Sequence, residues 1–573
     1  MITEYYYNSQ DQITKYSHSG QGDVKTYRNI YDYAGRLQKV DYYTGSPDAP
    51  DPEYTNLTEY EFNQNSQISK QQYNDKNLEN VFEYNNRSWI TDMTSTKDIF
   101  IYSNNYFKNG NVKSQELSGG YNDNFTGASD LSFTYTYDRS NRLTETKSPD
   151  KTYELYNNYD KDGNILTLQR KGSTGNSIDD FNYSYYSGTN KLSKVAGSVN
   201  QYTYDANGNM TWDDLNKNFD IIYDYRNLII QLKQMIIDIH GSRNDTTIYH
   251  TFYYYDEAGN RIRKKVYNDE NDSLLKDIVY SRDLNGKEMA IYENGNIKQW
   301  NIWGLDNVGF ILTEGDKRYY LKDHLGSVRA VLDESETVIS SQDYDAWGYQ
   351  LQDRNYDSDV SIYKFTSKER DDENKYDYFG ARYYDARVGR WGSVDPIMET
   401  HFDNSPYNYV LDNPLYFIDS DGNDESPAIR PHDVSYTDYG TGFAFSAYQQ
   451  TTLNKALKAI FSQVIAYTVS QLMEYFKPKS IYVIGEEGQL EILGDIIEEI
   501  KITSLESRSH QNENLTKYIG KTDKEIKDAF DKMKNTPKKD RDKKEYKDLQ
   551  REMKARQMKQ SGYKDKSKKE KDN

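Results

Sequence analysis

A short pattern built on Tyr-Asp recurs through the first 361 residues and restricts the folds open to this chain. In each copy an aspartate follows a tyrosine, and glycine, asparagine or arginine comes shortly after. Residues before each copy alternate, as in 133–137, which is the period of a β-strand. The aspartate caps a turn and the glycine or asparagine supplies its positive φ. Each copy therefore predicts strand, turn and strand, as at Tyr31-Asp32, Tyr137-Asp138, Tyr159-Asp160, Tyr204-Asp205 and Tyr255-Asp256.

Tyrosine explains how such a chain builds a core. The hydrophobic fraction is 35% and the mean hydropathy is −1.02, values that would otherwise be typical of disorder. The chain has 57 tyrosines, however, and tyrosine is a strand former with an apolar ring and a polar hydroxyl. We predict a mainly β body over residues 1–361, in which successive hairpins pair edge to edge.

Residues 362–423 carry a dense series of motifs. The run 378–385, YFGARYYD, is followed by Gly389-Arg390-Trp391, Asp395-Pro396, Tyr407-Asn408-Tyr409, Asn413-Pro414 and Asp419-Ser420-Asp421-Gly422. This series resembles the RHS-repeat-associated core domain. Together with the Tyr-Asp repeats, the resemblance covers about three quarters of the chain.

The resemblance implies a polymorphic toxin-like protein of the RHS/YD-repeat family. Its expected parts are a β-hairpin spiral shell over 1–361, a self-cleaving core over 362–423, and a small α+β effector over 424–573. From the residues alone, a solid β-solenoid or sandwich is an alternative to the shell.

The resemblance also implies an aspartyl-type self-cleavage at Asp395 and Asp419. Two carboxylates that share one proton can act as acid and base. Arg390 is expected to hold the charged carboxylate or to polarise the scissile carbonyl. The expected bond lies just after Gly422, near Asn423.

Several alternatives stay open at this site. Met398 and Ser420 stand where the family pattern has glycine and proline, and Asp421 is an alternative partner to Asp419. The aspartates could instead only cap turns. His324 has no nucleophile or carboxylate spaced around it in a known pattern, so a structural role is predicted.

The composition changes after Gly422. Helices are predicted near 453–476 and from 522, with a hairpin over 481–493 between them. Residues 511–573 hold 21 Lys and Arg against 13 Asp and Glu, whereas the whole chain carries a net charge of −19. This basic end suggests an acidic partner such as nucleic acid. For a ribonuclease-like effector the available residues are His510, Glu525, Arg551 and Arg556. A charged, solvated helix is the alternative.

The combined expectation is a toxin-delivery protein of interbacterial competition that is secreted or surface-associated and enters target cells. Its expected partners are its own enclosed C-terminal domain, an immunity protein, a secretion apparatus and nucleic acid as the toxin's target. No cofactor or metal is predicted, and the absence of cysteine excludes thiolate zinc sites. Neither a signal peptide nor a membrane span is evident. A non-catalytic surface or adhesion protein with an inert tail is the alternative.

Overall fold

The computed structural model describes residues 2–428, except 21–22, 126–129, 198, 241–242, 284, 401–403 and 424, and two later strands at 482–484 and 490–492. The chain forms two compact units, Met1–Gly442 and Phe443–Asn573. The Tyr-Asp repeats and the core motifs lie together in the first unit.

The first unit is built on two large antiparallel meanders in which each strand pairs with the next one along the chain. The first is a 15-stranded sheet. Its strands are β1 Ile2–Tyr7, β2 Ile13–Gly20, β3 Asp23–Tyr31, β4 Leu37–Thr44, β5 Thr55–Phe62, β6 Ile68–Tyr73, β7 Leu78–Tyr84, β8 Ile90–Ser95, β9 Ile101–Tyr106, β10 Val112–Ser118, β11 Leu131–Tyr137, β12 Leu143–Lys147, β13 Leu155–Tyr159, β14 Ile165–Lys171 and β15 Ser177–Asn182.

The second large sheet has 14 strands and follows a short two-stranded sheet of β16 Ser184–Tyr185 and β17 Leu192–Lys194. Its strands are β18 Tyr202–Tyr204, β19 Met210–Asp213, β20 Asn218–Tyr223, β21 Ile229–His240, β22 Arg243–Tyr255, β23 Arg261–Asn268, β24 Ser273–Arg282, β25 Glu288–Glu293, β26 Asn296–Trp303, β27 Asn307–Leu312, β28 Lys317–Lys322, β29 Val328–Asp333, β30 Val338–Tyr344 and β31 Gln350–Tyr356.

Short elements make up the core segment. A four-stranded sheet holds β32 Glu369–Arg370, β33 Asp377–Tyr378, β34 Tyr383–Asp385 and β35 Arg390–Trp391, and a hairpin joins β36 Phe417–Asp419 to β37 Glu425–Pro427. The described helical turns are η1 Asn74–Lys76, η2 Thr96–Asp98, η3 Gly120–Asn124, η4 Ser358–Val360, η5 Phe365–Ser367, η6 Met398–Thr400 and η7 Val410–Asp412.

The Tyr-Asp turn has the geometry that the sequence predicts. Asp32 Oδ1 accepts from the backbone N–H of Ala34 and of Arg36, each at 2.9 Å. Its Oδ2 accepts from the guanidinium of Arg36 at 2.7 Å. The same pattern recurs at Asp138 with Arg142, Asp160 with Asn164, Asp205 with Asn209 and Asp256 with Asn260. The prediction that this aspartate caps its own turn is confirmed.

The tyrosine before several of these aspartates has a second function that the pattern did not reveal. Its ring packs on the core, and its hydroxyl donates to a carbonyl oxygen at the start of the preceding strand. Tyr31 at the end of β3 bonds Ile13 O at 2.9 Å, and Tyr255 at the end of β22 bonds Ile229 O at 2.7 Å. Equivalent bonds are made by Tyr137, Tyr159 and Tyr223, which also precede an aspartate, and by Tyr84 and Tyr106, which do not. Tyr185 of β16 makes a similar bond to Ile165 O at the start of β14. Tyrosine thus satisfies a backbone carbonyl where phenylalanine could not.

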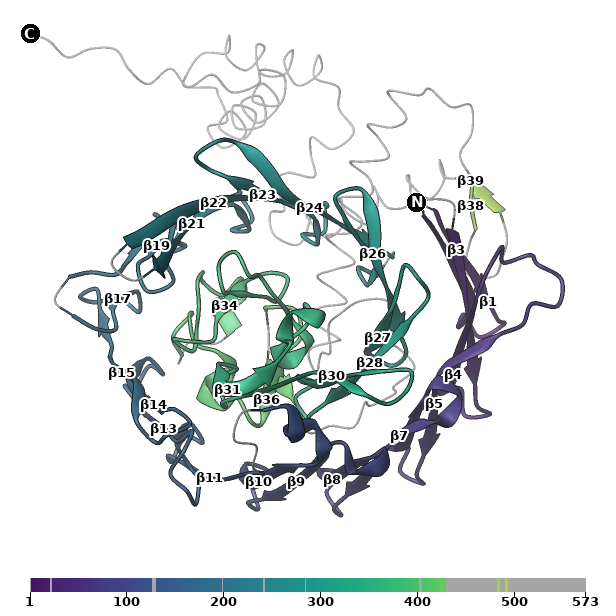
Figure 1. The fold of residues 1–573 in the computed structure, drawn as a ribbon, viewed down its shortest axis with the longest axis horizontal. Coiled ribbons are helices and arrows are strands. Elements are labelled where there is room, and N and C mark those ends of the chain that lie inside the picture. Colours follow the sequence, from purple (N-terminus) through teal and green to yellow (C-terminus); the bar gives the residue numbers. More distant parts are fainter. Residues whose placement is uncertain are drawn as a thin grey trace, which may run out of the picture. The chain divides into compact units, whose positions relative to one another are not determined.

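The strands of the first unit follow a spiral in which the second sheet returns to the start of the first (Figure 1). Ser281 of β24 lies 3.0 Å from His18 of β2, and the hydroxyl of Tyr60 in β5 accepts from Leu305 N at 3.1 Å. The segment from β31 to β36 lies within the turn of the spiral. This arrangement confirms the predicted mainly β, YD-repeat fold.

Polar contacts fix the core segment to strands throughout the spiral. Arg170 of β14 donates to Ala386 O at 3.0 Å, and Tyr407 donates to Gly208 O at 2.7 Å. Asn413 donates to the side chain of Asn111 at 3.0 Å. Because these partners lie on distant strands, folding of the core segment depends on the completed spiral.

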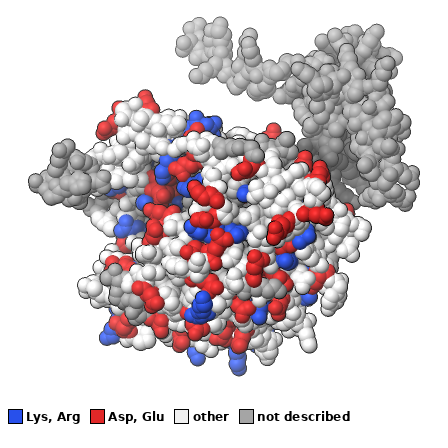
Figure 2. All heavy atoms as spheres, turned by 45° about the vertical axis from the view of Figure 1, so that its right-hand side comes forward, with Lys and Arg blue, Asp and Glu red and all other residues white. Residues whose placement is uncertain are grey.

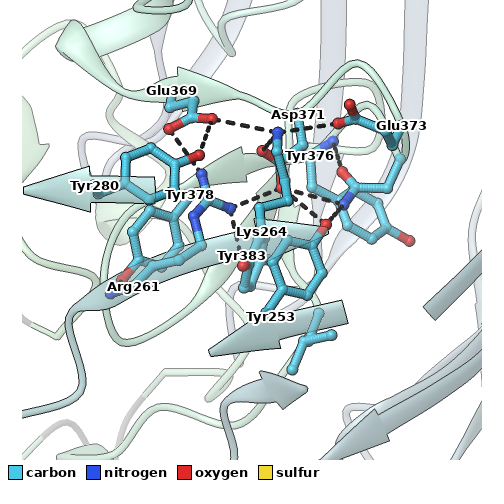
Figure 3. A network of polar contacts seen from close by, with 12 residues as sticks. Tyr253, Arg261, Lys264, Tyr280, Glu369, Asp371, Glu373, Tyr376, Tyr378 and Tyr383 are labelled. Atoms are coloured by element: carbon cyan, nitrogen blue, oxygen red, sulfur yellow. Dashed lines mark hydrogen bonds and ion pairs between the residues drawn. The ribbon is translucent and has the colours of Figure 1, made fainter. Parts of the chain in front are cut away.

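A buried charge cluster also attaches the core segment to the spiral (Figure 3). Arg261 of β23 is fully buried and binds Glu369 and Asp371, each at 2.8 Å. Lys264 binds Asp371 at 2.9 Å and Glu373 at 3.0 Å. The hydroxyls of Tyr280 and Tyr253 add bonds to Glu369 and Asp371. Every carboxylate of the cluster therefore has a cationic partner, as burial of charge requires.

The surface in Figure 2 carries acidic side chains with Lys and Arg interspersed among them. In the second unit the described strands β38 Tyr482–Ile484 and β39 Leu490–Ile492 pair antiparallel, with Val483 opposite Glu491. This pairing confirms the hairpin predicted over 481–493. The helices predicted near 453–476 and from 522 lie outside the described residues.

Candidate self-cleavage site

One guanidinium joins both candidate aspartates to the expected scissile bond. Arg382 binds Asp395 Oδ2 through Nη1 at 3.0 Å and Asp419 Oδ2 through Nη2 at 3.2 Å. Its Nε donates to the carbonyl oxygen of Gly422 at 2.6 Å, and Nη2 reaches Asn423 O at 3.3 Å. The side chains of Arg382 and Asp419 are each 3% exposed. The Arg382 guanidinium thus contacts both carboxylates and the two carbonyl oxygens of residues 422 and 423.

The local backbone brings this bond close to Arg382. β36 pairs with β37, so residues 420–423 lie in the hairpin turn that follows Asp419. Gly422 has φ +82°, and a Cβ there would lie 2.9 Å from Arg382 N. Gly380 has φ +110°, and its Cβ would lie 2.7 Å from Asp421 O. Only glycine allows these two loops to approach so closely.

Each aspartate both caps a turn and contacts the arginine. Asp395 Oδ1 accepts from Ile397 N at 2.8 Å while its Oδ2 binds Arg382. Asp419 Oδ1 accepts from Gly422 N at 2.7 Å while its Oδ2 binds the same guanidinium. Turn capping was the alternative role for these two aspartates. It uses one oxygen of each carboxylate and orients the other toward Arg382, so capping and catalysis are compatible.

Burial controls the protonation of the site. It raises the pKa of Asp419 to about 6, opposed by Arg382 and assisted by Asp421. Burial also lowers the pKa of Lys368, whose ammonium group donates to Ser420 O in the same turn. Asp419 thus keeps its proton to a higher pH than a free aspartate does.

Arg390 does not take the position expected from the sequence. Successive residues of a strand point to opposite faces. In β35 the Trp391 ring covers Arg382, with the guanidinium carbon 4.2 Å from the ring centroid, so Arg390 points away. Its hydrogen bonds go to Asn164, Tyr185 and Asn190. Arg382 belongs to the motif at 378–385. Its contacts with Asp419, Gly422 and Asn423 could not be predicted, because they depend on packing between segments that are distant in the sequence.

The two departures from the family pattern lie at the edge of the site. Met398 is 48% exposed at the start of η6, and Ser420 is exposed in the turn between β36 and β37.

His324 does not belong to this site. It stacks on Tyr102 with ring centroids 5.4 Å apart, and its Nε2 is 3.0 Å from Leu415 O. These contacts agree with a structural histidine.

The candidate effector residues His510, Glu525, Arg551 and Arg556 lie outside the described residues. Within the part of the chain that the structure describes, no group of three His, Asp or Glu side chains is placed to hold a metal ion. Nor does any described helix have the length and apolar character needed to cross a membrane.

Comparison with known proteins identifies the class of the chain. The Teneurin YD-shell family model matches residues 51–421, well over half of the sequence. The chain therefore belongs to the Teneurin YD-shell family, in agreement with the RHS/YD-repeat resemblance.

The curated proteins that resemble this chain include a nuclease, a toxin subunit and a surface protein. The tRNA3(Ser)-specific nuclease WapA of Bacillus spizizenii is 28% identical over 299 residues, which are 50% of this chain and 12% of that protein. Toxin subunit YenC1 of Yersinia entomophaga is 24% identical over 46% of this chain and 28% of its own length. Salivary gland surface protein 1 of Aedes aegypti is 33% identical over 29% of this chain and 5% of its length. The chain thus spans a small part of these relatives.

Solved structures show the same fold. The crystal structure of TcdB2-TccC3-Cdc42 matches with a TM-score of 0.60 at 18% identity, over 74% of this chain and 21% of that one. The Photorhabdus luminescens Tc holotoxin pore matches with a TM-score of 0.58 at 16% identity, over 74% and 22%. At such low identity the likeness concerns the fold.

Proposed function

We propose that this chain cleaves itself between Gly422 and Asn423 and thereby releases a C-terminal toxin that its YD shell carries. The observation that carries the proposal is the contact of Arg382 with Asp395, Asp419 and the Gly422 carbonyl oxygen. A general acid, a general base and a hydrogen-bond donor to the carbonyl oxygen then act on the same peptide bond. Peptide hydrolysis without a metal requires these three groups.

The geometry assigns a role to each group. Asp395, ionised beside Arg382, takes a proton from the attacking water. The water oxygen bonds to the Gly422 carbonyl carbon, and Arg382 Nε–H stabilises the negative charge that develops on the carbonyl oxygen. Asp419 then gives its proton to the Asn423 nitrogen as the C–N bond breaks. The products are a carboxylate at Gly422 and an amine at Asn423.

The released segment, 423–573, contains the expected effector over 424–573, which is proposed to act on nucleic acid. Its net positive end supports this, as do the nuclease names of the WapA relatives. The RHS/YD-repeat resemblance further implies that the shell encloses this segment before release, that a secretion apparatus delivers it into target cells, and that it has a cognate immunity protein.

Toxicity tests the effector proposal. Expression of residues 424–573 in a bacterial cytoplasm is expected to arrest growth and to degrade cellular RNA. The control is the same segment with both Arg551 and Arg556 changed to alanine, which removes two candidate phosphate contacts. Normal growth with abundant 424–573 protein would contradict the proposal and favour an adhesion protein with an inert tail.

The raised pKa of Asp419 predicts how cleavage depends on pH. Asp419 can donate only when neutral, and its neutral fraction falls about tenfold for each pH unit above its pKa of about 6. The cleavage rate should therefore fall as pH rises from 6 to 8. The measurement is refolding of denatured full chain at a series of pH values, with the fragment followed on a gel. A rate that is constant or rises over this range would argue against Asp419 as the acid.

A further inference from the structure

The peptide group between Gly422 and Asn423 is held at both ends by charged side chains. Arg382 Nε donates to the Gly422 carbonyl oxygen at 2.6 Å. On the other side of the bond, the Asn423 N–H donates to Asp421 Oδ1 at 3.0 Å. The nitrogen that must leave in the proposed cleavage therefore already contacts a carboxylate, and this carboxylate belongs neither to Asp395 nor to Asp419.

The surrounding backbone fixes Asp421 in this position. Its own N–H donates to Asp419 Oδ1 at 3.2 Å, and its carbonyl oxygen accepts from Ala381 N at 2.9 Å. A Cβ at Gly380 would lie 2.7 Å from the same carbonyl oxygen, so the loop between β33 and β34 packs directly on Asp421. The carboxylate is thus oriented before the bond is cut, as electrostatic catalysis by a fixed group requires.

The contacts of Asp421 differ from those of the aspartates in the Tyr-Asp turns. There Oδ1 accepts from the N–H groups two and four positions on, as at Asp32 with Ala34 and Arg36. Asp421 Oδ1 accepts from the N–H two positions on, and Arg382 binds the carbonyl oxygen of that same peptide group. Turn formation alone explains the capping contact but does not require a guanidinium on the other end of the capped peptide group.

The negative charge of Asp421 also acts on Asp419. Burial raises the pKa of Asp419 to about 6, Arg382 and Lys368 oppose this shift, and Asp421 adds to it. Tyr409 faces Asp419 as well; burial, with the charge of Asp419, raises the pKa of its hydroxyl well above the usual range, so it stays neutral. Removal of the charge on Asp421 should therefore lower the pKa of Asp419.

We propose that Asp421 is a third catalytic carboxylate of this site, which holds the leaving nitrogen of Asn423 and stabilises the positive charge that develops on it. This role rests on the proposed self-cleavage. Once Asp419 has given its proton, the nitrogen carries two hydrogens and a positive charge, while the oxygen bound by Arg382 carries the negative charge.

The C–N electron pair then goes to the nitrogen as the bond breaks, which leaves a carboxylic acid at Gly422 and an amine at Asn423. A hydrogen bond to a carboxylate is stronger while the donor nitrogen is charged. The contact with Asp421 therefore stabilises the transition state more than the intact peptide, which is the condition for faster cleavage.

Asp421→Asn in the full chain tests this role. The amide oxygen can still accept from Asn423 N, so the turn is kept while the charge is lost. At its optimal pH the variant should cleave about tenfold more slowly, since a hydrogen bond to a charged group is stronger than one to a neutral group by about that factor. Its rate should also begin to fall at a lower pH than in wild type, because Asp419 loses its proton earlier. Asp421→Ala, which removes the acceptor too, should be slower still.

The matched control is Asp333→Asn. Asp333 Oδ1 caps the turn between β29 and β30 through Ser335 N at 2.8 Å and Thr337 N at 2.9 Å, far from the cleavage site in sequence. This variant should keep the wild-type rate and pH profile. The measurement is the fragment formed after refolding of denatured chain at a series of pH values, followed on a denaturing gel.

Wild-type cleavage by Asp421→Asn would overturn this role and leave the proposed self-cleavage standing. A slower variant with the wild-type pH profile would also overturn it, because a role in the turn alone gives that result. A wild-type chain that stays intact would refute the self-cleavage itself, and the role of Asp421 with it.

Discussion

Asp395→Asn is expected to stop release of the C-terminal segment. The amide cannot take a proton from water, and loss of a general base slows catalysis by about 10²–10⁴-fold. Its Oδ1 can still cap the turn through Ile397 N, so the fold should be retained. The measurement is the fraction of cleaved chain over time on a denaturing gel, after refolding side by side with wild type.

The matched control for this variant is Asp256→Asn. Asp256 caps a Tyr-Asp turn through Asn260 and takes no part in the cleavage site, so cleavage should continue at the wild-type rate. Wild-type cleavage by the Asp395 variant would show that another group is the base.

Arg261→Met should be the most destabilising of the substitutions considered. It leaves buried Glu369 and Asp371 without one of their cations, and breaking such a pair costs about 3–5 kcal/mol. The variant should unfold at a markedly lower urea concentration than wild type. Tyr383, next to Arg382, accepts from the Arg261 guanidinium, which also lies over the Tyr378 ring at 4.3 Å, so cleavage should slow as well.

Arg263→Met is the control on the same strand. Arg263 binds Asp277 at 2.6 Å but is 41% exposed, and such surface pairs contribute about 0–1 kcal/mol. Its unfolding midpoint should stay close to wild type. Equal midpoints for the two variants would mean that the buried cluster does not stabilise the attachment of the core segment.

The turns and strands could be predicted because they depend on residues that are close together in the sequence. The turn at Asp32 depends on bonds to Ala34 and Arg36, and the sequence shows all three. The alternation of strand residues is equally visible. The hydroxyl bond of Tyr31 to Ile13 could not be predicted, because it depends on the register between neighbouring strands.

The candidate site shows where sequence reasoning reaches its limit. The motifs indicated Asp395 and Asp419, and the structure places both on one guanidinium. They did not distinguish Arg382 from Arg390, which is nearer to Asp395 in sequence. The distinction comes from the face of β35 that Trp391 occupies and from the glycine that lets the cleavage turn approach. Both are properties of packing between segments that lie far apart in the chain.

Intact mass analysis of the purified, denatured wild-type chain tests the central claim most directly. Self-cleavage predicts two species, one ending at Gly422 and one beginning at Asn423, whose masses add up to the full chain and one water. A single species with the mass of all 573 residues would contradict it.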